Sequence, residues 1–155
     1  MTYNIIDTIP NNKQPNVNKH VYQPPPVIEN RCGGQILQMK IINGKESIIL
    51  SPGYGRTSYA PKDDCTWILT ASRGNVIRLT FDIFDLQTST GCMADYLEVI
   101  DGPSDHHPRL ARLCGYRRQK PLISRGNVVI LKFSSNSFIE EEGFRIRASA
   151  ECKLF

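Results

Sequence analysis

One group of residues has the side chains needed for metal binding or for acid/base catalysis. Asp105, His106 and His107 are consecutive, and imidazole and carboxylate groups ligate metals or transfer protons near neutral pH. They lie between turn residues, however, and no serine of the chain stands in a motif that activates a nucleophile. We therefore interpret the group as a solvated loop, and expect a chain that is not an enzyme and has no resident cofactor.

Cysteines form the second group with potential chemistry, and there are five of them: Cys32, Cys65, Cys92, Cys114 and Cys152. None forms a Cys-x-x-Cys pair and no histidine stands at zinc-finger spacing beside them, so a metal cluster is not expected. Widely spaced cysteines in a small β-rich chain indicate structural disulfides, which persist in an oxidising compartment. We expect an extracellular domain with one cysteine left over; five buried thiols in a cytosolic protein is the alternative.

The charges exclude some partners. Lys and Arg number 19 against 15 Asp and Glu, a net charge of +4 that is spread along the chain. Nucleic-acid binders carry a denser basic stripe with interleaved aromatic residues, so we expect no nucleic acid as partner. The most concentrated basic stretch contains Arg109, Arg112, Arg117, Arg118 and Lys120. We interpret these side chains as solvated, or as a binding site for glycosaminoglycan or acidic protein. Glu140, Glu141 and Glu142 are interpreted as a solvated loop, or as an attraction for a basic partner.

No apolar run is long enough to cross a membrane, and residues 1–10 lack the pattern of a signal peptide. We therefore expect membrane association only through an anchor outside this sequence.

Alternating apolar residues predict the elements that hold these groups. Residues 77–83 and 144–149 alternate apolar and polar side chains, which is typical of half-buried strands, and residues 128–131 are apolar throughout. Turn sequences separate the apolar runs, and no stretch has helical periodicity. The pattern predicts an all-β, two-sheet antiparallel sandwich. We expect its core to contain Trp67, Ile77, Leu79, Phe81, Leu97, Val99, Val129, Leu131, Phe133 and Phe144.

Composition divides the chain into three parts. Residues 1–31 are rich in Asn and Pro, including Pro24, Pro25 and Pro26, and are expected to be a disordered linker. Residues 32–152 form the domain, and residues 153–155 are expected to begin a further segment.

Short motifs in a fixed order resemble the CUB domain pattern over residues 32–152. They include Cys32-Gly33-Gly34, Ser51-Pro52-Gly53-Tyr54, Cys65-Thr66-Trp67, Phe84-Asp85-Leu86, Asp95-Tyr96-Leu97-Glu98-Val99, Asp101-Gly102, Leu113-Cys114-Gly115 and Gly143-Phe144. The resemblance implies a jelly-roll-like sandwich with disulfides Cys32–Cys65 and Cys92–Cys114. Cys152 is then left without a partner, and we assign it to a following module.

The resemblance also implies a position for calcium. Many CUB domains hold Ca²⁺ with three acidic residues, and the matching positions here are Gln87, Asp95 and Asn136. Only one of the three is a carboxylate, so we expect weak Ca²⁺ binding at most. Nearby candidates for ligand binding are Tyr54, Tyr59, Asp95 and Asn136, although both tyrosines also fit a packing role with a wet hydroxyl.

The resemblance further implies a function. We expect a non-catalytic protein-recognition module of a secreted or membrane-anchored multidomain protein, such as a receptor or auxiliary receptor, with other extracellular proteins as partners. One alternative is a substrate-selecting or assembly domain of an extracellular protease. Another is a spermadhesin-like glycan binder.

Overall fold

The computed structural model describes residues 27–28, 34–136 and 138–154. Nearly all of its regular structure is β, as expected. The strands are β1 (Val27–Ile28), β2 (Ile36–Ile41), β3 (Glu46–Leu50), β4 (Asp64–Ala71), β5 (Asn75–Leu86), β6 (Tyr96–Ile100), β7 (Arg109–Leu113), β8 (Gly115–Tyr116), β9 (Leu122–Ile123), β10 (Val128–Ser134) and β11 (Gly143–Cys152). One short 3₁₀ helix, η1 (Thr90–Cys92), precedes β6.

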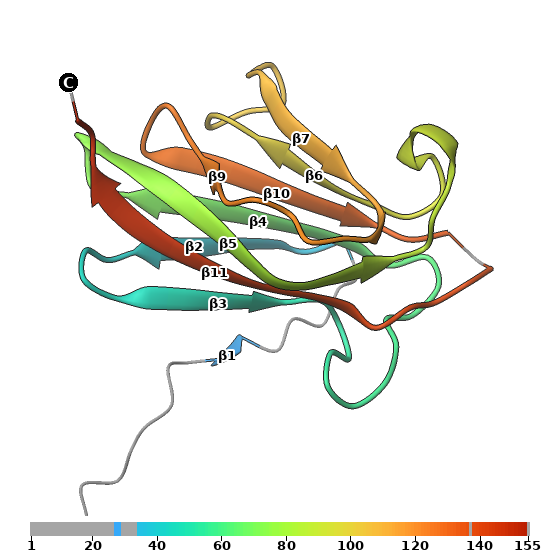
Figure 1. Ribbon diagram of the computed structural model, residues 1–155. Coiled ribbons are helices and arrows are strands. Elements are labelled where there is room, and N and C mark those ends of the chain that lie inside the picture. Colours follow the sequence, from blue (N-terminus) through green and yellow to red (C-terminus); the bar gives the residue numbers. More distant parts are fainter. Residues whose placement is uncertain (1–26, 29–33, 137, 155) are drawn as a thin grey trace, which may run out of the picture.

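The strands form two sheets that pack face to face (Figure 1). One sheet has the order β1-β3-β11-β5-β8, with β9 also paired to β5, and the other has the order β2-β4-β10-β6-β7. Most neighbours are antiparallel, so the expected two-sheet sandwich is confirmed. The pairs β1–β3 and β2–β4 are parallel, which alternation along single strands does not predict.

The core fills the space between the sheets, and nine of the ten predicted core residues are buried there. Phe144 lies near its centre, with ring centroids 5.9 Å from Trp67 and 5.4 Å from Phe133 in edge-to-face arrangements. Each fully buried large apolar side chain stabilises the fold by about 1.5–3 kcal/mol. These aromatic residues therefore carry much of the attachment between the sheets.

Phe81 is the core residue that differs from the expectation, because β5 is irregular at this point. The register opposite β11 shifts so that Ile146 faces Phe81 while Arg145 faces Ile83. The extra residue, Asp82, reverses the alternation, and Phe84 becomes a core residue. Phe81 is only partly buried and packs against the core from its margin.

Residues 27 and 28 are the described part of the expected linker, residues 1–31. They form β1, in which Val27 is the register partner of Ile48 and Ile28 that of Ile49, so this short strand extends the six-stranded sheet. The rest of the expected linker, residues 1–26 and 29–31, lies outside the described residues.

Disulfide bonds follow the expectation as far as the described residues allow. Cys92 and Cys114 are bonded, with 5.4 Å between their Cα atoms, and tie η1 to the end of β7. Cys65 is also a disulfide cysteine, but its predicted partner, Cys32, lies outside the described residues. Cys152 has a free, exposed thiol.

Candidate functional site at the loop end

Three loops meet at one end of the sandwich, which we call the loop end. They are residues 51–63 between β3 and β4, 87–95 between β5 and β6, and 135–142 between β10 and β11. In Figure 1 they lie at the right, opposite the C-terminus. The Lys62 amide donates to the Asn136 carbonyl at 2.9 Å, and the Ser135 amide donates to the Asp63 carbonyl at 3.0 Å. The first and third loops are therefore joined through their backbones.

A buried carboxylate connects all three loops. Asp95 has 0% of its surface exposed. Its Oδ2 accepts a hydrogen bond of 2.5 Å from the Tyr59 hydroxyl, and its Oδ1 accepts one of 2.7 Å from the Asn136 amide. The Tyr59 hydroxyl in turn accepts the Gln87 amide at 3.1 Å. Because a buried carboxylate is costly unless it is hydrogen-bonded, this network fixes the loops relative to one another.

Tyr59 is suited to a structural role. Only 1% of its surface is exposed, and its ring lies edge-on to Phe133 with centroids 5.3 Å apart. Burial, together with the hydrogen bond to Asp95, raises the pKa of Tyr59 above its ordinary value. The hydroxyl therefore stays protonated at neutral pH and remains a donor to the carboxylate.

Burial changes the set of side chains that a ligand can touch. Tyr59 and Asp95 were expected among the ligand-binding residues, but both are enclosed in the protein and cannot contact a partner directly. Tyr54 and Asn136 are partly exposed. Asn136 bonds within its own loop, where its Oδ1 accepts the Phe138 amide at 3.0 Å.

Exposed apolar side chains at the loop end were missed by the sequence reasoning. Met93 is 75% exposed, Phe138 79% and Ile139 51%. One sequence feature could have identified them: apolar residues that belong to no strand pattern, such as Phe138-Ile139 between polar residues.

An acidic hollow of about 570 Å³ adjoins this surface. Four carboxylates line it, those of Glu140, Glu141, Glu142 and Asp85, together with residues 55–58, which include Arg56. Nearby, burial and then the charge of Glu142 raise the pKa of Tyr54. The loop end thus combines apolar side chains with negative charge.

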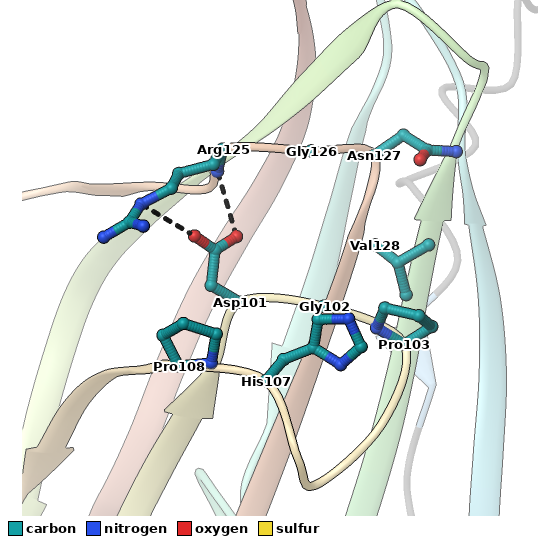
Figure 2. Close-up of a pocket in the computed structure, with 9 residues that line it drawn as sticks. All are labelled: Asp101, Gly102, Pro103, His107, Pro108, Arg125, Gly126, Asn127 and Val128. Atoms are coloured by element: carbon teal, nitrogen blue, oxygen red, sulfur yellow. Dashed lines mark hydrogen bonds and ion pairs between the residues drawn. The ribbon is translucent and has the colours of Figure 1, made fainter.

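A second hollow, of about 430 Å³, lies between the β6–β7 turn and the β9–β10 turn (Figure 2). Its one buried charge is Asp101, whose Oδ1 accepts the Arg125 amide at 2.9 Å. His107 covers Gly102, where an added Cβ would lie 2.2 Å from the imidazole ring. Asp101 and Arg125 hold the two turns together, while the Asn127 side-chain amide donates to the Ala71 carbonyl at 2.9 Å.

The Asp105-His106-His107 group does not assemble a site. Asp105 pairs with Lys132 at 2.6 Å, His107 contacts Ser104 at 2.9 Å, and His106 is exposed. Within residues 34–136 and 138–154, no three His, Cys, Asp or Glu side chains are grouped to hold a metal ion. No helix of the described chain is long and apolar enough to cross a membrane.

In the comparison with known families, the model of the CUB domain matches residues 32–147. The match covers most of the chain. This protein belongs to the CUB domain family.

Similar proteins contain the CUB domain as a part of a longer chain. Human tolloid-like protein 1 is 34% identical over 111 residues, which cover 72% of this chain and 11% of that protein. The solved full extracellular region of zebrafish Gpr126/Adgrg6 has a TM-score of 0.65 at 28% identity, covering 77% of this chain and 15% of that one. The present chain thus spans about a tenth of the length of the first of these relatives.

The family raises the question of calcium. A crystal structure of the MASP-1 CUB2 domain bound to Ca²⁺ has the same fold, with a TM-score of 0.62 and 22% identity over 76% of this chain and 99% of that one. In this CUB domain, both oxygens of Asp95 already accept hydrogen bonds, and the Asn136 Oδ1 accepts an amide. The buried Gln87 Oε1 is the one side-chain oxygen of the three without a partner among the described residues.

The side-chain oxygens of Gln87, Asp95 and Asn136 do not fit a calcium site. Ca²⁺ takes six to eight oxygen ligands and depends on carboxylates for affinity. Here a single carboxylate is engaged on both oxygens, and one amide oxygen remains. We therefore derive no role for the ion in this domain.

Proposed function

We propose that this CUB domain is a non-catalytic protein-recognition module of an extracellular multidomain protein, secreted or membrane-anchored, and that its loop end is the contact surface. The observation that carries the proposal is the exposure of Met93, Phe138 and Ile139 on loops that a buried network holds in place. Exposed apolar side chains gathered on one surface are characteristic of protein contact sites.

The arrangement has the two parts that a recognition surface needs. Met and Phe are enriched where proteins bind one another, and a few such residues carry most of the binding energy. The Tyr59–Asp95–Asn136 network orders the loops before a partner arrives, which lowers the entropy lost on binding. The surrounding glutamates favour a partner with a basic rim around an apolar contact.

The proposed location rests on the disulfide chemistry. The Cys92–Cys114 bond persists in oxidising compartments and is rare in the cytosol. One similar structure is described as an extracellular region. A role in a receptor or auxiliary receptor is consistent with both observations.

The test is a binding experiment with two matched double variants. The purified domain is tetramerised and screened against a panel of secreted proteins and ectodomains, and the affinity of each purified hit is measured. Phe138→Ser/Ile139→Ser should weaken a specific hit by about thirtyfold or more, since a contact residue of this kind is worth about 2 kcal/mol.

The control is Ile42→Ser/Ile123→Ser, which replaces two exposed isoleucines, 55% and 45%, away from the loop end. This control should change the affinity less than twofold. The proposal is wrong if both double variants weaken the hits equally, or if the loop-end variant binds as well as the unmodified domain.

A further inference from the structure

A long stretch of the chain carries positive charge only. Residues 106–139 contain no Asp or Glu and seven basic residues: Arg109, Arg112, Arg117, Arg118, Lys120, Arg125 and Lys132. Such a stretch must find its counter-charges elsewhere in the protein or leave cations for an external partner.

Four of the seven form ion pairs with three acidic residues outside the stretch. Glu98 pairs with Arg112 at 3.0 Å and with Arg109 at 3.7 Å. The other two pairs are Arg125 with Asp101 at 3.5 Å and Lys132 with Asp105 at 2.6 Å. Arg112 also stacks over the Tyr96 ring at 3.6 Å. The basic stretch is therefore divided, and Arg109 and Arg112 belong to its ion-paired part, in which they share Glu98.

The other three cations are neighbours. Arg117, Arg118 and Lys120 lie in the segment between β8 and β9, and all three are exposed. No ion pair of these side chains is found among the described residues. Tyr116, at the start of the segment, is 79% exposed. We call residues 116–120 the basic row.

The basic row follows the edge of the six-stranded sheet. Tyr116 lies opposite Asp85, the Arg117 amide donates to the Phe84 carbonyl at 3.2 Å, and Leu122 lies opposite Leu79. The segment therefore runs along β5 in the opposite direction. At about 3.3 Å per residue, an extended segment spreads Arg117 and Lys120 over about 10 Å.

We propose that the basic row binds a sulfated polysaccharide. Arg presents a planar fork of donors that matches tetrahedral and carboxylate anions, and a short segment rich in Lys and Arg is typical of heparin-binding patches. An extended polyanion can contact cations that lie in a line. The row begins opposite Asp85, which also lines the loop-end hollow, and runs from there along β5 toward Leu79, away from the loop end.

The same edge is unsuited to an acidic peptide. A peptide that adds to a sheet edge obtains its affinity from backbone hydrogen bonds along a continuous strand. Here the edge consists of two strands of two residues each, β8 and β9, and the segment between them ends in Pro121. Proline and charged side chains both block strand addition. A ligand that requires only a line of positive charge fits better.

Heparin is the probe, and its affinity is measured by titration between 50 and 200 mM salt. For three ion contacts at the charge density of DNA, affinity should fall on the order of 40-fold over this range. Arg117→Gln/Arg118→Gln/Lys120→Gln should lose most of the binding at 50 mM salt, together with most of the salt dependence. All three side chains are exposed, so the melting temperature should stay within error.

A control with the same change in net charge is Lys40→Gln/Lys45→Gln/Arg73→Gln, in three exposed residues distant in sequence from the row. This control should retain binding within about twofold. Equal losses in the two variants, or no heparin binding by the unmodified domain at 50 mM salt, would overturn the proposal. So would size-matched polyglutamate that binds as tightly as heparin and depends on the same three residues, because the ligand would then be acidic protein.

Discussion

Replacing Tyr59 by phenylalanine removes one hydroxyl from the network that orders the loop end. Two hydrogen bonds disappear, the 2.5 Å bond to Asp95 Oδ2 and the 3.1 Å bond from the Gln87 amide. A hydrogen bond to a charged group contributes about 1.5–3 kcal/mol, and a buried group left without a partner costs a similar amount. We expect Tyr59→Phe to lower the free energy of unfolding by about 2–4 kcal/mol.

Urea denaturation measures the effect. With a denaturant dependence of about 2 kcal/mol per molar, the midpoint should fall by about 1–2 M. Tyr116→Phe is the control, because its hydroxyl belongs to a side chain that is mostly in water, and it should change the unfolding free energy by less than about 0.5 kcal/mol.

A double-mutant cycle with Asp95→Asn tests the reasoning itself. If the hydroxyl acts through the carboxylate, the two substitutions should be non-additive by about 1 kcal/mol or more. Additive effects, or a Tyr59→Phe variant as stable as the control, would refute the assignment of Tyr59 as the residue that satisfies Asp95.

The dependence of the unfolding free energy on pH above 10 gives a second test of Tyr59. The pKa of Tyr59 is raised in the folded protein, so its contribution to stability is complete below the ordinary tyrosine pKa of about 10. That contribution is lost as the pH rises toward the folded value. Between about pH 10 and 11, Tyr59→Phe should lose less stability than the unmodified domain.

Three further predictions concern the metal, one glycine and the cysteines. Millimolar Ca²⁺ should not shift the melting temperature relative to chelator, whereas Gln87→Glu/Asn136→Asp should create a shift. A calcium site of ~10 μM affinity would add about 2.7 kcal/mol to the free energy of unfolding. A shift in the unmodified domain that Asp95→Ala abolishes would contradict this prediction. Gly143→Ala should destabilise by about 2 kcal/mol or more in urea melts, because φ is +98° and the new Cβ would lie 1.9 Å from Ser51 Oγ; an unchanged midpoint would show that Ser51 moves aside freely. Non-reducing peptide mapping should find Cys32–Cys65, and a bridge from Cys152 to any other cysteine of the domain would disprove this pairing.

Alternation in the sequence predicts the sandwich because successive side chains of a strand point to opposite faces, so every second residue enters the core. It succeeds for Ile77 and Leu79, whose strand is regular there. It fails at Phe81, because one extra residue on β5 reverses the alternation, and a bulge depends on the partner strand. The pairing of Val27 and Ile28 with β3 was missed for a similar reason, since two residues are too few to show a period.

The site was predictable in part. The resemblance located Gln87, Asp95 and Asn136 near one end of the sandwich, and the structure places them around the same network. Motifs do not show that Tyr59 satisfies Asp95, because this contact joins residues 36 positions apart. They also do not separate Arg112, which is paired, from Arg117, since the counter-charge Glu98 comes from a neighbouring strand.

The position of β11 between β3 and β5 also has a consequence for folding kinetics. Arg145 on the last strand pairs with Leu50 on β3, 95 residues earlier. During synthesis, the edges of β3 and β5 that pair with β11 therefore stay unpaired until the end of the domain has been made. Contacts of such long sequence separation slow folding and leave strand edges exposed to other chains meanwhile. The domain should accordingly be most vulnerable to aggregation before β11 has docked.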